Sequence, residues 1–326
     1  FRAKSKATSE DFKQAVSDYK ALKDTSKAFF DQQGLGNSKF KKDMFEYYQL
    51  AYLQLIDMTF KSSSGYALYN TEGSDLKSNP DVRAAANGFR EYVDAFPEAE
   101  NAPNVLNTSA VYYYKIKDMA KTMETRHLMI EKYPTSKYYI DHIAELGYAY
   151  ETIADFETAA QWYEKLFELD KEHASAKDAF YTASLFRESL GQWEKAVENK
   201  KKYIEAFPED ERTLGMKIDI PKIYQKFDQV DKAKTAYNAF QKSPPKDAPI
   251  EFVFFARMKY GEILRDENRP DRLDKHWEMV LKQFDKLTEE QMTPQMKVFK
   301  AEAAFERGTY SSRKYMDSKI SGPSSS

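Results

Sequence analysis

The chain has 326 residues, 41% of them hydrophobic and 31% charged, and its 50 Lys and Arg residues nearly balance 52 Asp and Glu residues. A nucleic-acid-binding protein normally shows a basic excess on one face, and a formal net charge of −2 provides none. The chain has no cysteine, which excludes disulfides, thiolate metal sites and cysteine nucleophiles.

The sequence contains no stretch that resembles a membrane span. A spanning helix needs about 18 or more consecutive apolar residues, and the most apolar stretch, residues 44–60, is interrupted by Glu46 and Asp57. No signal peptide precedes Phe1 and the chain does not begin with Met. We therefore expect a trimmed or mature fragment.

Two long helices are predicted at the start of the chain. Residues 9–33 form the first, with Glu10 and Asp11 in its first turn and Gly34-Leu35-Gly36 at its end. Residues 38–61 form the second, because apolar residues such as Phe40, Met44 and Tyr47 recur at spacings of three and four.

A polar segment at residues 62–79 follows and is predicted to be an irregular loop. It holds three consecutive serines, Gly65 and Gly73, and it is longer than the ~12–15 residues of most loops without function. A role as a second partner contact is therefore an alternative to plain disorder. Asn79 is predicted to cap the next helix, with Pro80 at its first position.

From residue 80 to about residue 285 the pattern alternates helix, short turn, helix and longer turn. The turns within pairs are predicted at residues 154–155, 190–191, 227–228 and 268–270. Five positions at the ends of the second helices lie 37 residues apart, and proline occupies four of them: Pro97, Pro134, Lys171, Pro208 and Pro245. A capping box at Thr288–Gln291 predicts a last helix at about residues 292–307.

Within each unit, small and large residues follow one scheme. In the clearest copy, small Gly147 and Ala159 let two helices approach, and Tyr150 and Tyr163 fill the space between them; the first helix also carries Ile143 and Leu146. One neighbouring unit carries Arg187 and Lys200 at the aromatic positions, and another carries Pro221 where glycine is expected.

The unit after Pro245 shifts its register by about three residues. Its matching positions are Tyr260, Gly261, Leu264, Leu273 and Trp277. We therefore expect the C-terminal units to be the specialised ones.

This scheme resembles the tetratricopeptide repeat, whose usual period is 34 residues, over residues 38–307. Repeat ends such as residues 132–138 and 206–209 resemble bacterial cell-envelope members, namely outer-membrane assembly lipoproteins and Tol-Pal coordinator proteins. The resemblance implies an all-α, right-handed superhelical solenoid of antiparallel helix pairs, with five to six repeats. Residues 1–37 would be the N-terminal cap, residues 38–307 the solenoid with segment 62–79 inserted in its first pair, and residues 308–326 a disordered tail or linker.

The resemblance also implies a concave groove lined by the first helices, and matching its offsets to this chain gives the groove residues. They are Asn107, Tyr114, Tyr148, Glu151, Tyr181, Glu188, Lys222 and Lys226. The tyrosines would form an aromatic ladder that grips a peptide or helix; the alternative is packing between units. The acids followed by the lysines would polarise the groove; the alternative is ordinary solvated helix charge.

Signals for catalysis are thin. The four histidines, His127, His142, His173 and His276, show no metal-ligand spacing, and His142 is expected to be structural. The sequence thus predicts a non-catalytic protein- or peptide-binding scaffold without metal or cofactor, in the bacterial envelope or periplasm, with the cytoplasm as the alternative location. A self-assembling homo-oligomer and an accessory domain of a larger motility, secretion or enzyme complex are the alternative functions.

Overall fold

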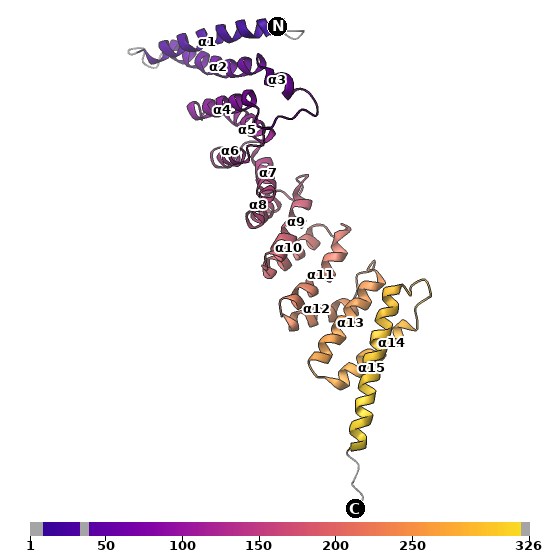
Figure 1. Ribbon diagram of the computed structural model, residues 1–326. Helices are drawn as coiled ribbons and strands as arrows, with labels where there is room; N and C mark the ends of the chain where they lie inside the picture. The colour runs from indigo at the N-terminus through magenta and orange to yellow at the C-terminus, as the bar shows by residue number, and fades with distance from the viewer. Residues whose placement is uncertain (1–8, 33–38, 321–326) are drawn as a thin grey trace, which may run out of the picture. The chain divides into compact units, whose positions relative to one another are not determined.

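The computed structural model describes residues 9–32 and 39–320, and Figure 1 shows their helices in chain order. The described residues form fifteen α-helices and no strand. The prediction of an all-α chain of repeated helix pairs is therefore confirmed. Gly34-Leu35-Gly36, predicted to end the first helix, lies outside the described residues.

The chain divides into two compact units, Phe1–Ala179 and Phe180–Ser326. Within the first unit each helix packs on the next one in the chain, and α2 also contacts α4. Its helices are α1 (Ser9–Asp31), α2 (Lys39–Lys61), α3 (Ser64–Tyr69), α4 (Pro80–Ala95), α5 (Ala102–Lys115), α6 (Met119–Lys132), α7 (Tyr139–Thr152) and α8 (Phe156–Leu169).

The boundary between the units falls inside α9 (Ala176–Ser189). In the second unit α10 to α15 pack in sequence, and α13 also contacts α15. These helices are α10 (Trp193–Ala206), α11 (Arg212–Lys226), α12 (Val230–Lys242), α13 (Ile250–Asp266), α14 (Pro270–Phe284) and α15 (Pro294–Ile320). The predicted division into an N-terminal cap and a solenoid, the superhelical hand and the repeat count stay predictions.

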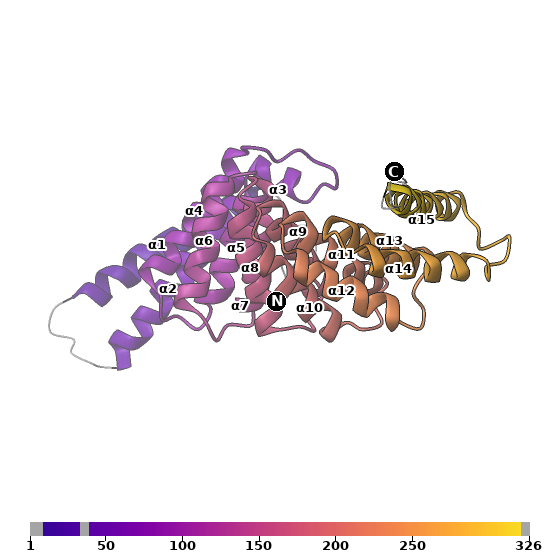
Figure 2. The same cartoon turned by 90° about the horizontal axis from the view of Figure 1, so that it is seen from below.

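The segment 62–79, predicted to be irregular throughout, contains the short helix α3 between α2 and α4, as both ribbon views show (Figures 1 and 2). The Ser63 side chain caps this helix, and Asp81 at the start of α4 accepts hydrogen bonds from the Ser64 hydroxyl at 3.1 Å and the Gly65 amide at 2.8 Å. A Cβ atom on Gly65 would lie 2.5 Å from that of Asp81, so glycine permits this contact.

The last helix was predicted to end at residue 307, but α15 continues to Ile320, so the prediction of a disordered tail from residue 308 is wrong up to that residue. A single glycine such as Gly308 costs a helix about 1 kcal/mol, and no proline follows until Pro323. Arg307 and Tyr310 also reach Asp274 and Asp271 of α14. The Thr288–Gln291 hydrogen bonds form as predicted, but in a turn that precedes Pro294.

The turns inside the five helix pairs from α5 to α14 are built in the same way. A residue with positive φ ends the first helix, and the next residue donates its amide to a carbonyl five residues earlier, as from Asp155 to Tyr150 at 3.0 Å. The positive-φ residues are Lys117, Ala154, Gly191, Asp228 and Asn268. The first four lie 37 residues apart, and the fifth carries the three-residue shift that the sequence predicted.

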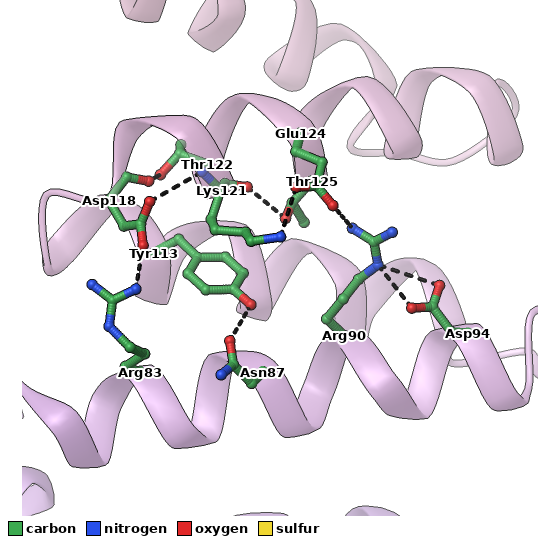
Figure 3. Close-up of polar contacts among 10 residues, drawn as sticks. All are labelled: Arg83, Asn87, Arg90, Asp94, Tyr113, Asp118, Lys121, Thr122, Glu124 and Thr125. Carbon is green, nitrogen blue, oxygen red and sulfur yellow. Dashed lines mark hydrogen bonds and ion pairs between the residues drawn. The ribbon is translucent and has the colours of Figure 1, made fainter.

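Polar side chains also tie α4 to α5 and α6, as Figure 3 shows. Arg83 forms an ion pair with Asp118, and the Tyr113 hydroxyl donates to the Asn87 amide oxygen at 2.6 Å. Burial alone would raise the pKa of Asp118, but the hydrogen bonds from Arg83 and from the Lys121 amide bring it below its usual range. Asp118 therefore serves both as the cap of α6 and as a link between α4 and α6.

The close approach predicted at Gly147 is present. A Cβ atom on Gly147 would lie 2.3 Å from the Tyr163 ring, and one on Gly261 would lie 2.3 Å from the Trp277 ring. Both pairs are separated by 16 residues, so the shifted C-terminal unit keeps the same contact between its two helices. The aromatic ring fills the space that the missing side chain leaves.

We predict that Gly261→Ala destabilises the second unit by about 1–3 kcal/mol, because the buried indole of Trp277 has to move. Gly215→Ala is the matched control. Gly215 lies inside α11 with nothing within 4 Å of its Cβ position, so alanine should stabilise the helix by about 0.5–1 kcal/mol. Thermal unfolding followed by circular dichroism measures both; equal effects would contradict the proposed close packing.

Candidate partner-binding site

In four consecutive helix pairs, one residue of the first helix lies opposite a residue of the second helix of the same pair. Three of these first-helix residues are among those predicted above to face the groove. The four first-helix residues are Tyr114, Glu151, Glu188 and Gln225, and each lies 12 residues before a side chain on the following helix: Arg126, Tyr163, Lys200 and Tyr237. All four of the latter are buried. The predicted groove residues therefore have contacts within their own repeat.

In the pair formed by α5 and α6, the residue on the second helix is a buried cation, Arg126. Arg126 is 3% exposed, its Nε lies 3.0 Å from a Glu145 carboxylate oxygen, and its guanidinium lies 5.4 Å from the centre of the Tyr114 ring. Burial raises the pKa of Glu145, although the Arg126 charge opposes that shift. Tyr114 thus packs against the buried Arg126 guanidinium, whose partner Glu145 is partly exposed; that Tyr114 also faces a groove stays a prediction.

Asn107 contacts His142, a histidine close to Arg126. Its Oδ1 lies 3.0 Å from Nε2 of His142, a fully buried residue. Burial, together with the nearby Arg126 charge, lowers the pKa of His142 to about 4, so the ring is neutral at neutral pH. The Asn107 side chain is therefore already used in a contact within the chain, and a binding protein is not needed to explain it.

Tyr148 and Glu151 differ in how accessible their side chains are to a binding partner. Glu151 accepts a hydrogen bond from the Tyr163 hydroxyl at 2.5 Å and thereby fixes the ring that covers Gly147. Tyr148 is 50% exposed. Burial raises the pKa of Tyr114, and the neighbouring Tyr148 hydroxyl adds to that shift, so the two phenols lie together. Of the predicted residues in this unit, Tyr148 is the one most open to a partner.

In the second unit, two predicted residues of opposite charge meet. Glu188 lies between Lys200, at 3.7 Å, and Lys226, at 3.8 Å. Lys200 is only 1% exposed, and Asp219 lies 4.0 Å from its ammonium. Glu188 therefore compensates a buried charge.

Tyr181 packs inside the second unit. Its ring lies 4.9 Å from the Arg212 guanidinium and 6.1 Å from the Tyr203 ring. These contacts show that packing, one of the two alternatives for this residue, takes place. Whether Tyr181 also touches a partner stays a prediction.

Lys222 lines a surface hollow of about 450 Å³ in the second unit, which we call the Phe255 pocket. Its lining comes from alternate helices, α11, α13 and α15. The residues are Ile218, Lys222, Glu251, Phe252, Phe255, Met258, Lys259, Glu262, Gln295, Phe299 and Glu302.

The half-buried ring of Phe255 dominates this pocket. The ammonium groups of Lys222 and Lys259 lie 5.1 Å and 5.8 Å from its centre, and the Phe299 ring lies 6.5 Å away. Buried Ile218 and Met258 form part of the lining. Apolar side chains share the lining with two lysines and three carboxylates, Glu251, Glu262 and Glu302, which suits an apolar side chain with polar neighbours of either charge.

Sequence reasoning included Lys222 but missed the aromatic residues. Phe252, Phe255, Lys259 and Glu262 recur at spacings of three and four, which places them on one face of α13. The family offsets were not carried into this unit because its register shifts. The sequence analysis had interpreted that shift as a sign that the C-terminal units are specialised, which stays a prediction.

The other histidines have structural contacts. His127 Nε2 lies 2.9 Å from the Tyr150 hydroxyl and His173 Nε2 lies 3.1 Å from Asp141. In the described part of the chain, no group of three or more His, Asp and Glu side chains is placed to hold a metal ion. None of the helices within residues 9–32 and 39–320 is long and apolar enough to cross a membrane.

No protein-family model and no curated protein sequence matches the chain. Solved structures do resemble it. MamA is 18% identical with a TM-score of 0.34, over 62% of this chain and 99% of its own. A tetratricopeptide repeat protein from Parabacteroides merdae is 12% identical with a TM-score of 0.32, over 87% of this chain and 99% of its own. YrrB, described as a tetratricopeptide protein with an unusual peptide-binding site, is 13% identical with a TM-score of 0.33, over 60% and 92%.

His142 gives a prediction for pH. Its pKa falls from about 6.5 in the unfolded chain to about 4 in the fold, so the unfolded chain binds the extra proton between these values. Stability should therefore fall by up to about 3 kcal/mol as the pH drops from 6.5 to 4. The variant His142→Gln should lose that part of the decline in denaturant unfolding. His276 is present in both chains, so parallel pH profiles would contradict the assignment.

Glu188 gives a prediction for stability. The change Glu188→Ala should cost about 1–3 kcal/mol, since it removes the nearer carboxylate from buried Lys200. The exposed pair of Glu198 and Lys202 is the control, where Glu198→Ala should cost less than about 1 kcal/mol. Adding Lys200→Met to Glu188→Ala should recover stability in a double-mutant cycle. Strictly additive losses would show that Glu188 does not compensate Lys200.

Proposed function

We propose that this chain is a non-catalytic protein- or peptide-binding scaffold whose principal contact is the Phe255 pocket. The observation that carries the proposal is the half-buried Phe255 ring, which lies in a hollow bordered by two lysines and further aromatic side chains. A partner segment would insert an apolar side chain against Phe255 and Phe299.

The charges around the pocket suit exchange with a partner. Lys222 pairs with Asp219 at 3.0 Å, and Lys259 pairs with Glu262 at 2.8 Å. Such pairs on a surface contribute little stability, so acidic or basic groups of a partner replace them at low cost. The pocket would therefore select mainly by the shape of the inserted side chain.

Among the other residues predicted from the sequence, Tyr148 supports a second contact in the first unit because half of its surface is open. Asn107, Tyr114, Glu151 and Glu188 would act mainly by holding the helices that present the groove. The α3 segment, fixed to α4 through Asp81, is a further surface that a partner could reach.

The setting that we propose is a bacterial envelope assembly in the periplasm. Its support is the resemblance of the repeat ends, such as residues 132–138, to envelope members of the tetratricopeptide family. A role as an accessory domain in a motility, secretion or enzyme complex is the alternative.

Self-association is a second candidate, and α15 favours it. This helix exposes several large apolar side chains: Val298, Phe305, Tyr315 and Met316. Peptide binding should therefore be measured at concentrations at which light scattering shows a single species.

Peptides selected from a random library on the immobilised wild-type chain test the proposal. Their affinity, measured by fluorescence anisotropy, should fall about 10- to 100-fold in Phe255→Ala and severalfold in Lys222→Ala, which changes an exposed residue. The control is Phe305→Ala, because Phe305 is 72% exposed on α15 and does not line the pocket; affinity should change less than about twofold.

Circular dichroism would verify that each variant keeps its helix content. Unchanged affinity in both Phe255→Ala and Lys222→Ala would overturn the assignment of the binding site to this pocket.

A further inference from the structure

A second hollow, of about 560 Å³, lies on the opposite face of α13 and is separate from the Phe255 pocket. Helix residues are spaced by about 100°, so Arg257 and Tyr260 point away from the face that carries Phe255 and Lys259. The rest of the lining comes from α12, the segment after it and α14. We call this hollow the Arg257 pocket.

The Arg257 pocket carries uncompensated positive charge. Arg257 and Lys242 both line it, and no Asp or Glu does. Neither cation has an ion pair with any of the described residues, although the whole chain is close to neutral. Two cations facing one hollow without a carboxylate favour the binding of an anion.

Arg257 is also held in place. Its guanidinium lies 4.6 Å from the centre of the Phe254 ring, and Phe254 is buried. Arg257 is half-buried, and this burial lowers its pKa. An arginine that is already desolvated and oriented binds an oxyanion at a smaller entropic cost than a free surface side chain.

The pocket also contains acceptors that lack a donor. Gln241 is nine-tenths buried, and its Oε1 has no hydrogen-bond partner, while its Nε2 donates to the Asn238 amide oxygen at 3.2 Å. The Oε1 of Gln283 is likewise without a partner. A buried acceptor without a donor destabilises the fold, so a ligand that supplies an N–H group to it gains affinity.

His276 adds shape but no charge to this pocket. Its Nε2 donates to the Arg257 carbonyl at 2.8 Å, and burial lowers its pKa, so the ring is neutral at pH 7. The positive field in the hollow therefore comes from Arg257 and Lys242.

We propose that the Arg257 pocket binds a carboxylate flanked by a neutral amide N–H, the chemistry of an N-acylated amino acid. The carboxylate pairs with Arg257 and Lys242, and the amide donates to Gln241 Oε1. A free amino acid fits less well because its ammonium would add positive charge beside Arg257. Inorganic phosphate supplies the anion without the amide.

Three probes separate these features in calorimetric titrations of the whole chain. N-acetylglycine should bind, with a Kd in the range of about 0.1–10 mM expected for so few contacts. N-acetylglycinamide, which lacks the carboxylate, and inorganic phosphate, which lacks the amide, should each bind at least about tenfold more weakly. Acetyl-triglycine distinguishes the source of the group: tighter binding than N-acetylglycine indicates a peptide end, and weaker binding indicates a small acylated amino acid.

Variants assign the binding to this pocket. Arg257→Gln should weaken N-acetylglycine binding at least about tenfold, and the exposed Lys242→Gln should weaken it severalfold if Arg257→Gln does not fold. Gln241→Leu should remove the preference for N-acetylglycine over phosphate. Arg272→Gln, which removes an exposed arginine of the same unit outside the pocket, is the control and should leave Kd unchanged.

Equal affinity for N-acetylglycine and its amide, or unchanged binding in both Arg257→Gln and Lys242→Gln, would overturn the proposal. The absence of any binding by N-acetylglycine up to about 50 mM would do so as well. The selected-peptide experiment on Phe255→Ala is independent of these outcomes, since Phe255 and Arg257 lie on opposite faces of α13.

Discussion

One steric constraint shapes two of the repeats: the two helices of the pair come into close contact where one of them carries glycine and an aromatic ring of the other fills the space. The ring of Tyr163 covers Gly147, and the ring of Trp277 covers Gly261, at the same separation of 16 residues. The turn must then return the chain at a fixed point, and a residue with positive φ in each of these turns does so. Once the pair and its turn are fixed, stacking of neighbouring pairs buries the remaining apolar surface.

Where a charged residue replaces the ring, a carboxylate from the same repeat or from the next one compensates its charge. Lys200 depends on Glu188, and Arg126 depends on Glu145 beneath the Tyr114 ring. Glu188 and Tyr114, both predicted to face the groove, thereby contact buried cations within their own helix pairs. The Phe255 pocket, by contrast, is lined mainly by α13, which belongs to the repeat whose register departs from the others.

Much of the fold was predictable because its signals are local. Prolines at the ends of second helices, the cap at Asn79 and the turn at residues 154–155 depend on neighbouring residues, and the structure confirms them. The short helix α3 was missed because it depends on Asp81, which is 16 residues from Gly65. The extension of α15 was missed because contacts with α14 hold it. For the site, family offsets identified Lys222, but the pocket joins three helices, and no spacing within one helix reveals its depth.

Photo-crosslinking tests the central claim most directly, namely that the Phe255 pocket is the principal contact. The peptides selected on the wild-type chain are compared, and the apolar position that recurs most often among them is identified. A photoreactive phenylalanine is placed at that position in one peptide, and mass spectrometry locates the crosslinked residues of the chain. The account predicts adducts on the residues of α11, α13 and α15 that line the pocket. Adducts confined to α5 and α7 around Tyr148 would contradict it.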